Sequence, residues 1–256
     1  MRVVRFAHEG RPVYGLVEGE AIAPLAAAPW ETGGEPKRAG APVERRSAAL
    51  LVPVVPTKIL CIGRNYRAHA AELGNEVPEK PLVFLKPLSS LLPHKGTVLL
   101  PPESARVDYE GELTAVIGRR GRRLSREEAA RAIFGYTCGL DISARDLQKA
   151  DGQWWRAKGF DTFCPLGPAI ETDIDPADLL LETLVDGAVR QSGRTSEMVH
   201  DVPSLVAWVS HAMTLEPGDV ILTGTPEGVA PLVPGQTVEV RIGGIGSLSV
   251  RVEKER

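Results

Sequence analysis

The chain has 256 residues, of which 43% are hydrophobic and 25% are charged, so we expect one large globular domain or one domain with a small appendage. Thirty Lys and Arg residues against 33 Asp and Glu residues give a net charge of −3, which leaves no excess of cations to neutralise a phosphate backbone. Nucleic acid is therefore not expected as a main partner.

The first residues do not read as a secretory signal, because Arg2, Arg5 and His8 interrupt the apolar run. The longest uncharged stretches, such as the one around residues 48–56, are short and broken by proline, unlike a membrane-spanning helix. The three cysteines are an odd number at wide spacings without a CxxC pair, which favours free thiols in a reducing compartment. We expect a cytoplasmic protein without a membrane partner.

The N-terminal region is predicted to be a small β domain. Residues 1–23 contain short apolar runs split by turn-forming residues, which predicts a hairpin and one further short strand. Residues 24–46 are rich in Ala, Pro and Gly, which indicates an irregular connection, followed by a short helix from Ser47. Prolines then precede a new strand at 58–62, so we divide the chain into domains 1–56 and 57–256.

The larger domain is dominated by predicted strands that are short, rich in Val, Ile, Leu and Thr, and bounded by Gly or Pro. They cover residues 81–87, 97–102, 112–118, 135–141, 167–172, 182–191, 219–225, 237–243 and 246–253. Few helices are expected: 66–73, 125–133, one after Ser143, and 202–213. The pattern predicts a β-rich fold with long loops.

Glu110 and Glu112 are the first candidates for chemistry. Residues two apart in a strand share a face about 6.6 Å apart, so these two carboxylates can converge on one ion. Gly111 between them is expected to leave the opposite face open. The alternative is an edge strand with two solvated glutamates, so a metal site needs a third ligand.

Asp141 supplies that candidate, because it ends an apolar run and precedes a helix start. Ser143 and Asp146 have the spacing of a capping box, which leaves Asp141 just outside the helix at a strand end. Three carboxylates without a nearby His or Cys in sequence favour Mg²⁺ or Mn²⁺ over Zn²⁺. The alternative for Asp141 is another helix cap.

His69 and Glu72 lie one turn apart on a predicted helix that Asn65 can cap and Gly74 can end. A carboxylate beside an imidazole favours the charged ring and fixes its orientation, as in a general base or water activator. A surface ion pair is the alternative interpretation.

Further residues suit an anionic substrate. Arg145 and Gln148 lie one turn apart on the helix after Asp141, and Lys158 can offer a cation to an enolate or a carboxylate. The strand-ending turn with Gly224 and Thr225 offers backbone N–H groups and a hydroxyl. Considered alone, each of these residues more often has a structural role: Arg145 in a salt bridge, Lys158 as a solvated side chain and Gly224 in a turn.

Together these stretches resemble the fumarylacetoacetate hydrolase family. The residues that carry the resemblance are 63–66 with His69 and Glu72, 84–87, 108–118, 139–148, 158–167 and 213–226. They occur in the family's order and span roughly residues 58–250, while residues 1–56 resemble the small N-terminal β domain of bacterial members.

The resemblance implies an α+β, β-rich fold, a mixed β-sandwich roll, in a protein that is usually a homodimer. It implies Mg²⁺ or Mn²⁺ on Glu110, Glu112 and Asp141. It further implies His69 and Glu72 as the dyad that activates water or moves a proton. The substrate is then expected to contact Lys158, Arg145, Gln148 and Thr225, with Gly224 and Arg64 as further candidates. Gly159 departs from the Ser that many relatives carry after the lysine.

The activity that the resemblance implies begins with a 2-oxo acid chelated by a divalent ion, which stabilises an enolate. Proton transfer, loss of CO₂ or attack of water can follow, and the ion ligands do not distinguish them. We favour a 2-hydroxyhepta-2,4-diene-1,7-dioate isomerase-like enzyme of aromatic catabolism. An acylpyruvate hydrolase and an oxaloacetate decarboxylase are the alternatives.

Two other classes of protein are less consistent with the sequence. A metal-dependent nuclease can use the same three acids, but the net charge of −3 argues against it. A non-catalytic metal-binding module would have no use for His69 and Glu72.

Overall fold

The largest element of the fold is a mixed sheet of twelve strands in the computed structural model, which describes residues 1–33 and 35–255. Ten strands follow the order β4-β3-β2-β1-β14-β12-β11-β17-β6-β7, while β5 pairs with β1 and β8 with β14. The bounds are β1 (Arg2–His8), β2 (Arg11–Glu18), β3 (Ala21–Pro24), β4 (Val43–Glu44), β5 (Ala49–Leu50), β6 (Ile59–Gly63), β7 (Leu82–Lys86), β8 (Leu91–Leu92), β11 (Gly111–Ile117), β12 (Ile133–Leu140), β14 (Cys164–Glu171) and β17 (Val220–Leu222).

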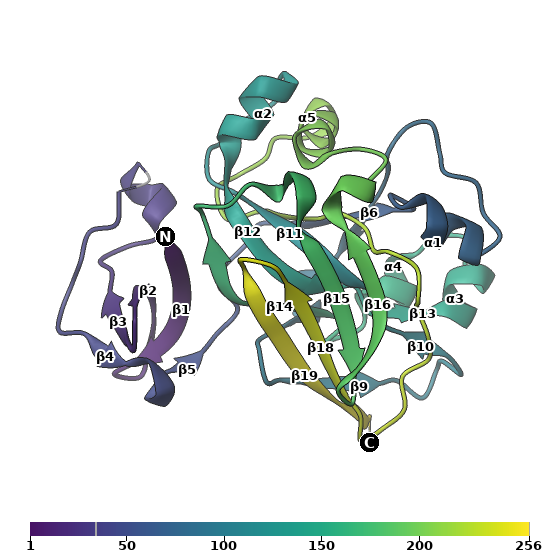
Figure 1. Ribbon diagram of the computed structural model, residues 1–256, viewed down its shortest axis with the longest axis horizontal. Helices are drawn as coiled ribbons and strands as arrows, with labels where there is room; N and C mark the ends of the chain where they lie inside the picture. Colours follow the sequence, from purple (N-terminus) through teal and green to yellow (C-terminus); the bar gives the residue numbers. More distant parts are fainter. Residues whose placement is uncertain (34, 256) are drawn as a thin grey trace.

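A second sheet of five strands packs against the first, in the order β16-β15-β18-β19-β9 (Figure 1). Its strands are β9 (Thr97–Leu100), β15 (Leu180–Val185), β16 (Ala188–Arg194), β18 (Thr237–Ile242) and β19 (Gly246–Lys254), and a separate pair joins β10 (Val107–Asp108) to β13 (Ser143–Ala144). Buried residues of both sheets, such as Leu113, Val240 and Leu248, share the main hydrophobic core. The predicted α+β, β-rich sandwich is confirmed.

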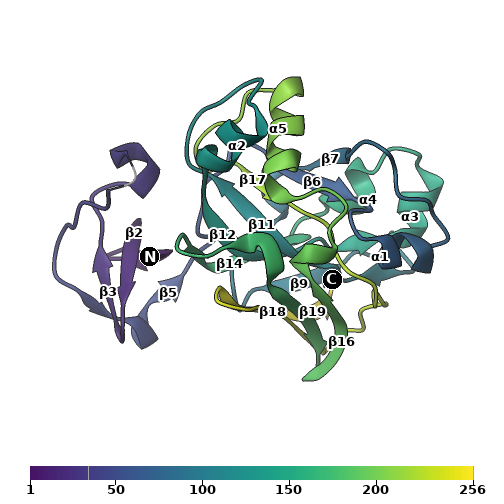
Figure 2. The same cartoon turned by 45° about the horizontal axis from the view of Figure 1, so that its top comes forward.

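The helices gather in two places around the sheets. They are α1 (Arg67–Glu72), α2 (Arg126–Ala132), α3 (Arg145–Ala150), α4 (Trp155–Gly159) and α5 (Val202–Ala212), with 3₁₀ turns at Pro29–Thr32, Arg45–Ser47, Leu88–Ser90, Pro176–Asp178 and Thr195–Glu197. Helices α2 and α5 pack together, and α4 packs on α3 and β7 (Figure 2). The four predicted helices are confirmed and α4 was missed. None of the described helices combines the length and the hydropathy that crossing a membrane requires.

The N-terminal strands extend the large sheet. Strand β1 pairs with β14 through Arg2 opposite Glu171 and Val3 opposite Ile170. The Arg2 side chain also contacts the Glu171 carboxylate at 3.4 Å and donates to the carbonyl of Ile245 at 2.9 Å. The predicted N-terminal hairpin and third strand are present as β1, β2 and β3.

Three local predictions are corrected. The single strand predicted at 182–191 is a hairpin, because Asp186 and Gly187 adopt the left-handed conformation of a tight two-residue turn between β15 and β16. The helix predicted from Ser47 is the end of a 3₁₀ turn that leads into β5. The connection 24–46 contains a 3₁₀ turn and β4, and its position 34 lies outside the described residues.

Both predicted side-chain caps are wrong, because distant segments take the same polar groups. Asn65 donates to the carbonyls of His200 and Thr223 and accepts from the His200 N–H, so Tyr66 precedes α1 without a side-chain cap. Ser143 donates to the carbonyl of Asp141, and Ala144 precedes α3 without a side-chain cap. The Asp146 carboxylate accepts from Ser104 and Ala105 instead.

Gly111 is closely packed, contrary to the open face predicted from the sequence. A Cβ at this position would lie 2.0 Å from Oγ1 of Thr183 on β15 and 3.2 Å from a methyl group of Val240. The five-stranded sheet therefore covers the back of the strand that carries the two glutamates. Only a glycine fits between them without moving β15.

We predict that Gly111→Ala destabilises the protein by about 1–3 kcal/mol, because the added methyl overpacks a closed interface. Thermal unfolding should show the loss, at about 2–4 °C per kcal/mol for a chain of this size. The Thr183 hydroxyl has no hydrogen-bond partner in the described part of the chain, so the double variant with Thr183→Ala should recover part of the stability. Equal melting temperatures of the wild-type protein and Gly111→Ala would contradict this packing.

Candidate active site

Three buried carboxylates meet where β11 begins and β12 ends. Glu110 precedes β11, Glu112 is its second residue, and Asp141 follows β12. The two strands are antiparallel with Gly111 opposite Leu140, so the start of one lies beside the end of the other. One oxygen from each carboxylate lies within 4.8 Å of the others, and each residue is at most 5% exposed. The predicted convergence of the three acids is confirmed.

The three carboxylates differ in their charge environment. Burial opposes ionisation of Glu110, but the Arg145 and Lys158 charges outweigh it and hold its pKa below the ordinary value. Burial, followed by repulsion from Asp141 and Glu110, raises the pKa of Glu112 well above its ordinary value. Among the described residues, the Glu112 carboxylate accepts a hydrogen bond only from the Gly224 N–H, at 2.7 Å. A buried, oxygen-only donor set with one poorly compensated carboxylate fits a hard divalent cation such as Mg²⁺ or Mn²⁺.

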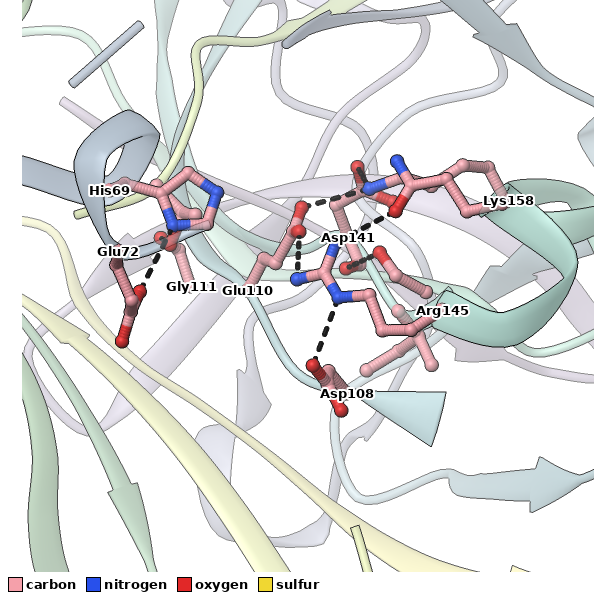
Figure 3. A network of polar contacts seen from close by, with 12 residues as sticks. His69, Glu72, Asp108, Glu110, Gly111, Asp141, Arg145 and Lys158 are labelled. Atoms are coloured by element: carbon pink, nitrogen blue, oxygen red, sulfur yellow. Dashed lines mark hydrogen bonds and ion pairs between the residues drawn. The ribbon is translucent and has the colours of Figure 1, made fainter. Parts of the chain in front are cut away.

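Two buried lysines contact this cluster (Figure 3 shows Lys158). Lys158 donates to Glu110 at 2.9 Å and to Asp141 at 2.6 Å. Burial lowers its pKa, but the charges of Asp141 and Glu110 outweigh that effect, so the net shift is upward and the amine stays protonated. Lys86 contacts the other Asp141 oxygen at 2.6 Å and donates to the carbonyls of Phe163 and Lys158. Lys86 was not predicted, since nothing local distinguishes it from other strand residues.

Arg145 is held by three acceptors. Its Nε donates to Asp108 at 2.9 Å, one terminal nitrogen donates to Gln148 at 3.0 Å, and the other contacts Glu110 at 2.5 Å. Asp108 is fully buried and also accepts two hydrogen bonds from Arg106. The predicted proximity of Arg145 and Gln148 is present, and Asp108 is a supporting residue that sequence reasoning missed.

The predicted His69–Glu72 pair is present on α1 (Figure 3). His69 Nδ1 lies 3.4 Å from a Glu72 oxygen, and the Glu72 carboxylate accepts from the Gly228 N–H. The His69 ring is only 5% exposed and lines the same cavity as the carboxylates. His69 therefore belongs to the cavity wall, while Glu72, whose side chain is 33% exposed, contacts the ring from outside the lining.

A cavity of about 430 Å³ connects these groups. Among the predicted site residues it is lined by Arg64, His69, Glu110, Glu112, Asp141, Arg145, Gln148, Lys158 and Thr225. Glu72 and Gly224 are not among the lining residues. The Gly224 N–H, which the sequence analysis assigned to the substrate, donates to Glu112 instead. The Thr225 hydroxyl donates to the Gly111 carbonyl and accepts from Gln191.

The rest of the cavity wall combines apolar and polar residues from loops and strand ends. It consists of Ile62, Gly63, Leu73, Asn75, Phe84, Lys149 and Trp154. The Phe84 and Trp154 rings pack edge to face with centroids 5.3 Å apart. These positions come from segments distant in sequence, so no local pattern identified most of them.

Comparison with known proteins agrees with this geometry. Residues 58–253 match the family described as Fumarylacetoacetate (FAA) hydrolase C-terminal, and residues 1–53 match the one described as Rv2993c-like, N-terminal. The chain is 44% identical to Protein Rv2993c of Mycobacterium tuberculosis, over 97% of both chains. The protein therefore belongs to the fumarylacetoacetate hydrolase family, as its motifs indicated.

Several relatives carry names that describe a reaction. The chain is 46% identical to the mitochondrial oxaloacetate tautomerase FAHD1 of Arabidopsis thaliana, over 77% of this chain and 92% of that one. It is also 46% identical to the mitochondrial oxaloacetate decarboxylase of Dictyostelium discoideum, over 73% of this chain and 89% of that one. A crystal structure named 2-hydroxyhepta-2,4-diene-1,7-dioate isomerase, from Mycobacterium marinum, superimposes with a TM-score of 0.92 at 44% identity, over 100% of this chain and 99% of that one.

We predict that Glu110→Gln weakens Mn²⁺ binding by at least about tenfold, equivalent to about 1.4 kcal/mol, because one charged ligand is lost. Isothermal titration with Mn²⁺ measures the change. Glu72→Gln is the matched control, because it makes the same substitution at a residue outside the cavity lining and should leave the Mn²⁺ affinity unaltered. Identical titrations of Glu110→Gln and the wild-type protein would refute the ligand assignment.

Proposed function

We propose that the protein is a divalent-cation-dependent enzyme that moves a proton on small 2-oxo and enol carboxylic acids, as a 2-hydroxyhepta-2,4-diene-1,7-dioate isomerase does. The observation that carries the proposal is the cavity itself, which joins three buried carboxylates, a buried lysine and the His69 ring. Relatives named tautomerase and isomerase support it, because both names describe the interconversion of isomers by proton movement.

Glu110, Glu112 and Asp141 are the residues that would hold the cation, and Mg²⁺ or Mn²⁺ suits their oxygen atoms. When bound, such a cation supplies Lewis-acid stabilisation of negative charge on a 2-oxo oxygen. Lys86 contacts one oxygen of Asp141 and Lys158 contacts the other, which fixes the orientation of that carboxylate. The protein thus presents a preorganised ligand set.

His69 is the residue proposed to take and return the proton. Its Nδ1 is directed at Glu72, so Nε2 is the ring nitrogen available to the carbon beside the 2-oxo group. The Gly228 N–H holds Glu72 in place behind the ring. Protonated Lys158 offers a positive charge to the substrate's carboxylate or to the oxygen on which charge develops.

Decarboxylation of oxaloacetate is the second candidate, because a relative of 46% identity carries that name. Hydrolysis of an acylpyruvate is a third outcome, in which His69 would activate water. The same side chains serve all three, since the reactions differ in which bond breaks to place negative charge on the 2-oxo oxygen: a C–H bond in isomerisation and a C–C bond in the other two. A homodimer, usual in this family, is part of the proposal.

The test is to follow three substrates by absorbance, each with Mg²⁺ and again with a chelator. They are an enol-form 2-hydroxydienedioate, oxaloacetate and an acylpyruvate. We expect cation-dependent isomerisation of the first, or enol-to-keto conversion of the second, to exceed any loss of CO₂ or cleavage. Faster cleavage of the acylpyruvate would replace the proposed reaction with hydrolysis, and full activity under chelation would remove the cation from it.

We predict that His69→Ala lowers kcat by about 10²- to 10⁴-fold, because it removes the general base. The variant should keep the Mn²⁺ affinity of the wild-type protein, because His69 is not among the three carboxylate ligands. His211→Ala, on the exposed face of α5, is the matched control and should keep full activity. Normal turnover by His69→Ala would remove the dyad from the mechanism.

A further inference from the structure

We propose that Arg64, assisted by Lys149, binds a second carboxylate of the substrate, so that the enzyme selects 2-oxo dicarboxylic acids over 2-oxo monocarboxylic acids. The inference rests on the proposed function and deepens it. It concerns the part of the cavity wall that lies outside the set of three acidic residues and that can contact the rest of the substrate.

The cationic residues of the cavity fall into two groups. Lys158 and Arg145 are neutralised by Asp108, Glu110 and Asp141 through short contacts. Arg64 and Lys149 line the same cavity, yet neither has an ion pair or a side-chain hydrogen bond within the described residues. Arg64 is also half-buried, so bulk water does not fully replace the missing partner. A half-buried guanidinium without an acceptor is suited to a carboxylate that arrives with the ligand.

The backbone at Arg64 is held in an unusual conformation. Six non-glycine residues of the described chain have positive φ, and Arg64, at 60°, is the one that lines the cavity. Such a conformation is strained for a residue with a side chain and persists only where the surroundings enforce it. They do so here, because buried Asn65 is tied to His200 and Thr223, and Gly63 lies close to the Trp154 ring. The Arg64 side chain therefore leaves a fixed backbone.

The charge balance of the cavity points to the same class of ligand. Three carboxylates and four Lys or Arg side chains line it, so the protein alone supplies a small positive excess. A divalent cation raises that excess to three charges, of which a monocarboxylate offsets one and a dicarboxylate two. The doubly charged acid is therefore better compensated in this cavity.

The experiment compares oxaloacetate with its 4-methyl ester, which keeps the 2-oxo acid and lacks the second negative charge. With Mg²⁺ present, kcat/KM for enol-to-keto conversion is measured for the wild-type protein, Arg64→Met, Arg64→Lys and Arg67→Met. We expect Arg64→Met to lose about tenfold or more on oxaloacetate and less than about twofold on the ester, as for a lost charge-assisted hydrogen bond. Arg64→Lys should recover part of the loss. Arg67→Met, exposed on α1 and outside the cavity lining, should match the wild-type protein.

Equal losses on the acid and the ester would overturn the proposal, because Arg64 would then act on the shared 2-oxo acid or on the fold. A calorimetric readout separates this failure from failure of the proposed function. Binding of 2-oxoglutarate and of its 5-methyl ester is titrated with Mg²⁺ present, whether or not any substrate turns over. Weaker binding of the diacid alone in Arg64→Met supports the second carboxylate site, and unchanged binding of both ligands refutes it.

Discussion

The antiparallel register of β11 and β12 is the constraint on which the site depends. It places Glu110, Glu112 and Asp141 within reach of one cation, at depths where a lone carboxylate would be strongly disfavoured. The fold offsets that cost with cationic side chains from three separate elements: Lys86 on β7, Arg145 on α3 and Lys158 on α4. Strand β7 and helices α3 and α4 thus position the three cationic side chains beside the carboxylates.

Two contacts of the site were predictable from the sequence because they lie within one strand or one helix. A two-residue period predicts that Glu110 and Glu112 share a face, and a three-residue interval predicts the contact of His69 with Glu72. Each depends on backbone geometry alone, and each is present. Helix α5 was predicted equally well, at 202–213 against the observed Val202–Ala212, because its apolar residues recur at helical spacing within one segment.

The remaining features depend on contacts between distant segments. Lys86 contacts Asp141, which lies 55 positions later in the sequence, and no residue near position 86 predicts that contact. Asn65 is a residue type that often caps helices, but its side chain hydrogen-bonds to His200, 135 residues away. The back of Gly111 is closed by Thr183, so a glycine that was expected to leave an open face instead lies directly against the second sheet. The cavity wall likewise comes from several loops, and its specificity could not be read from any one of them.

The pairing of β1 with β14 has a consequence for the exposure of a sheet edge to strand pairing with other molecules. An unpaired strand at a sheet edge is a template for pairing with another molecule. Here β14 is shielded by β1 and its hairpin, which continue the hydrogen-bonding ladder outward to β4. In this chain the N-terminal hairpin therefore covers an edge of the sheet that carries the three acidic residues.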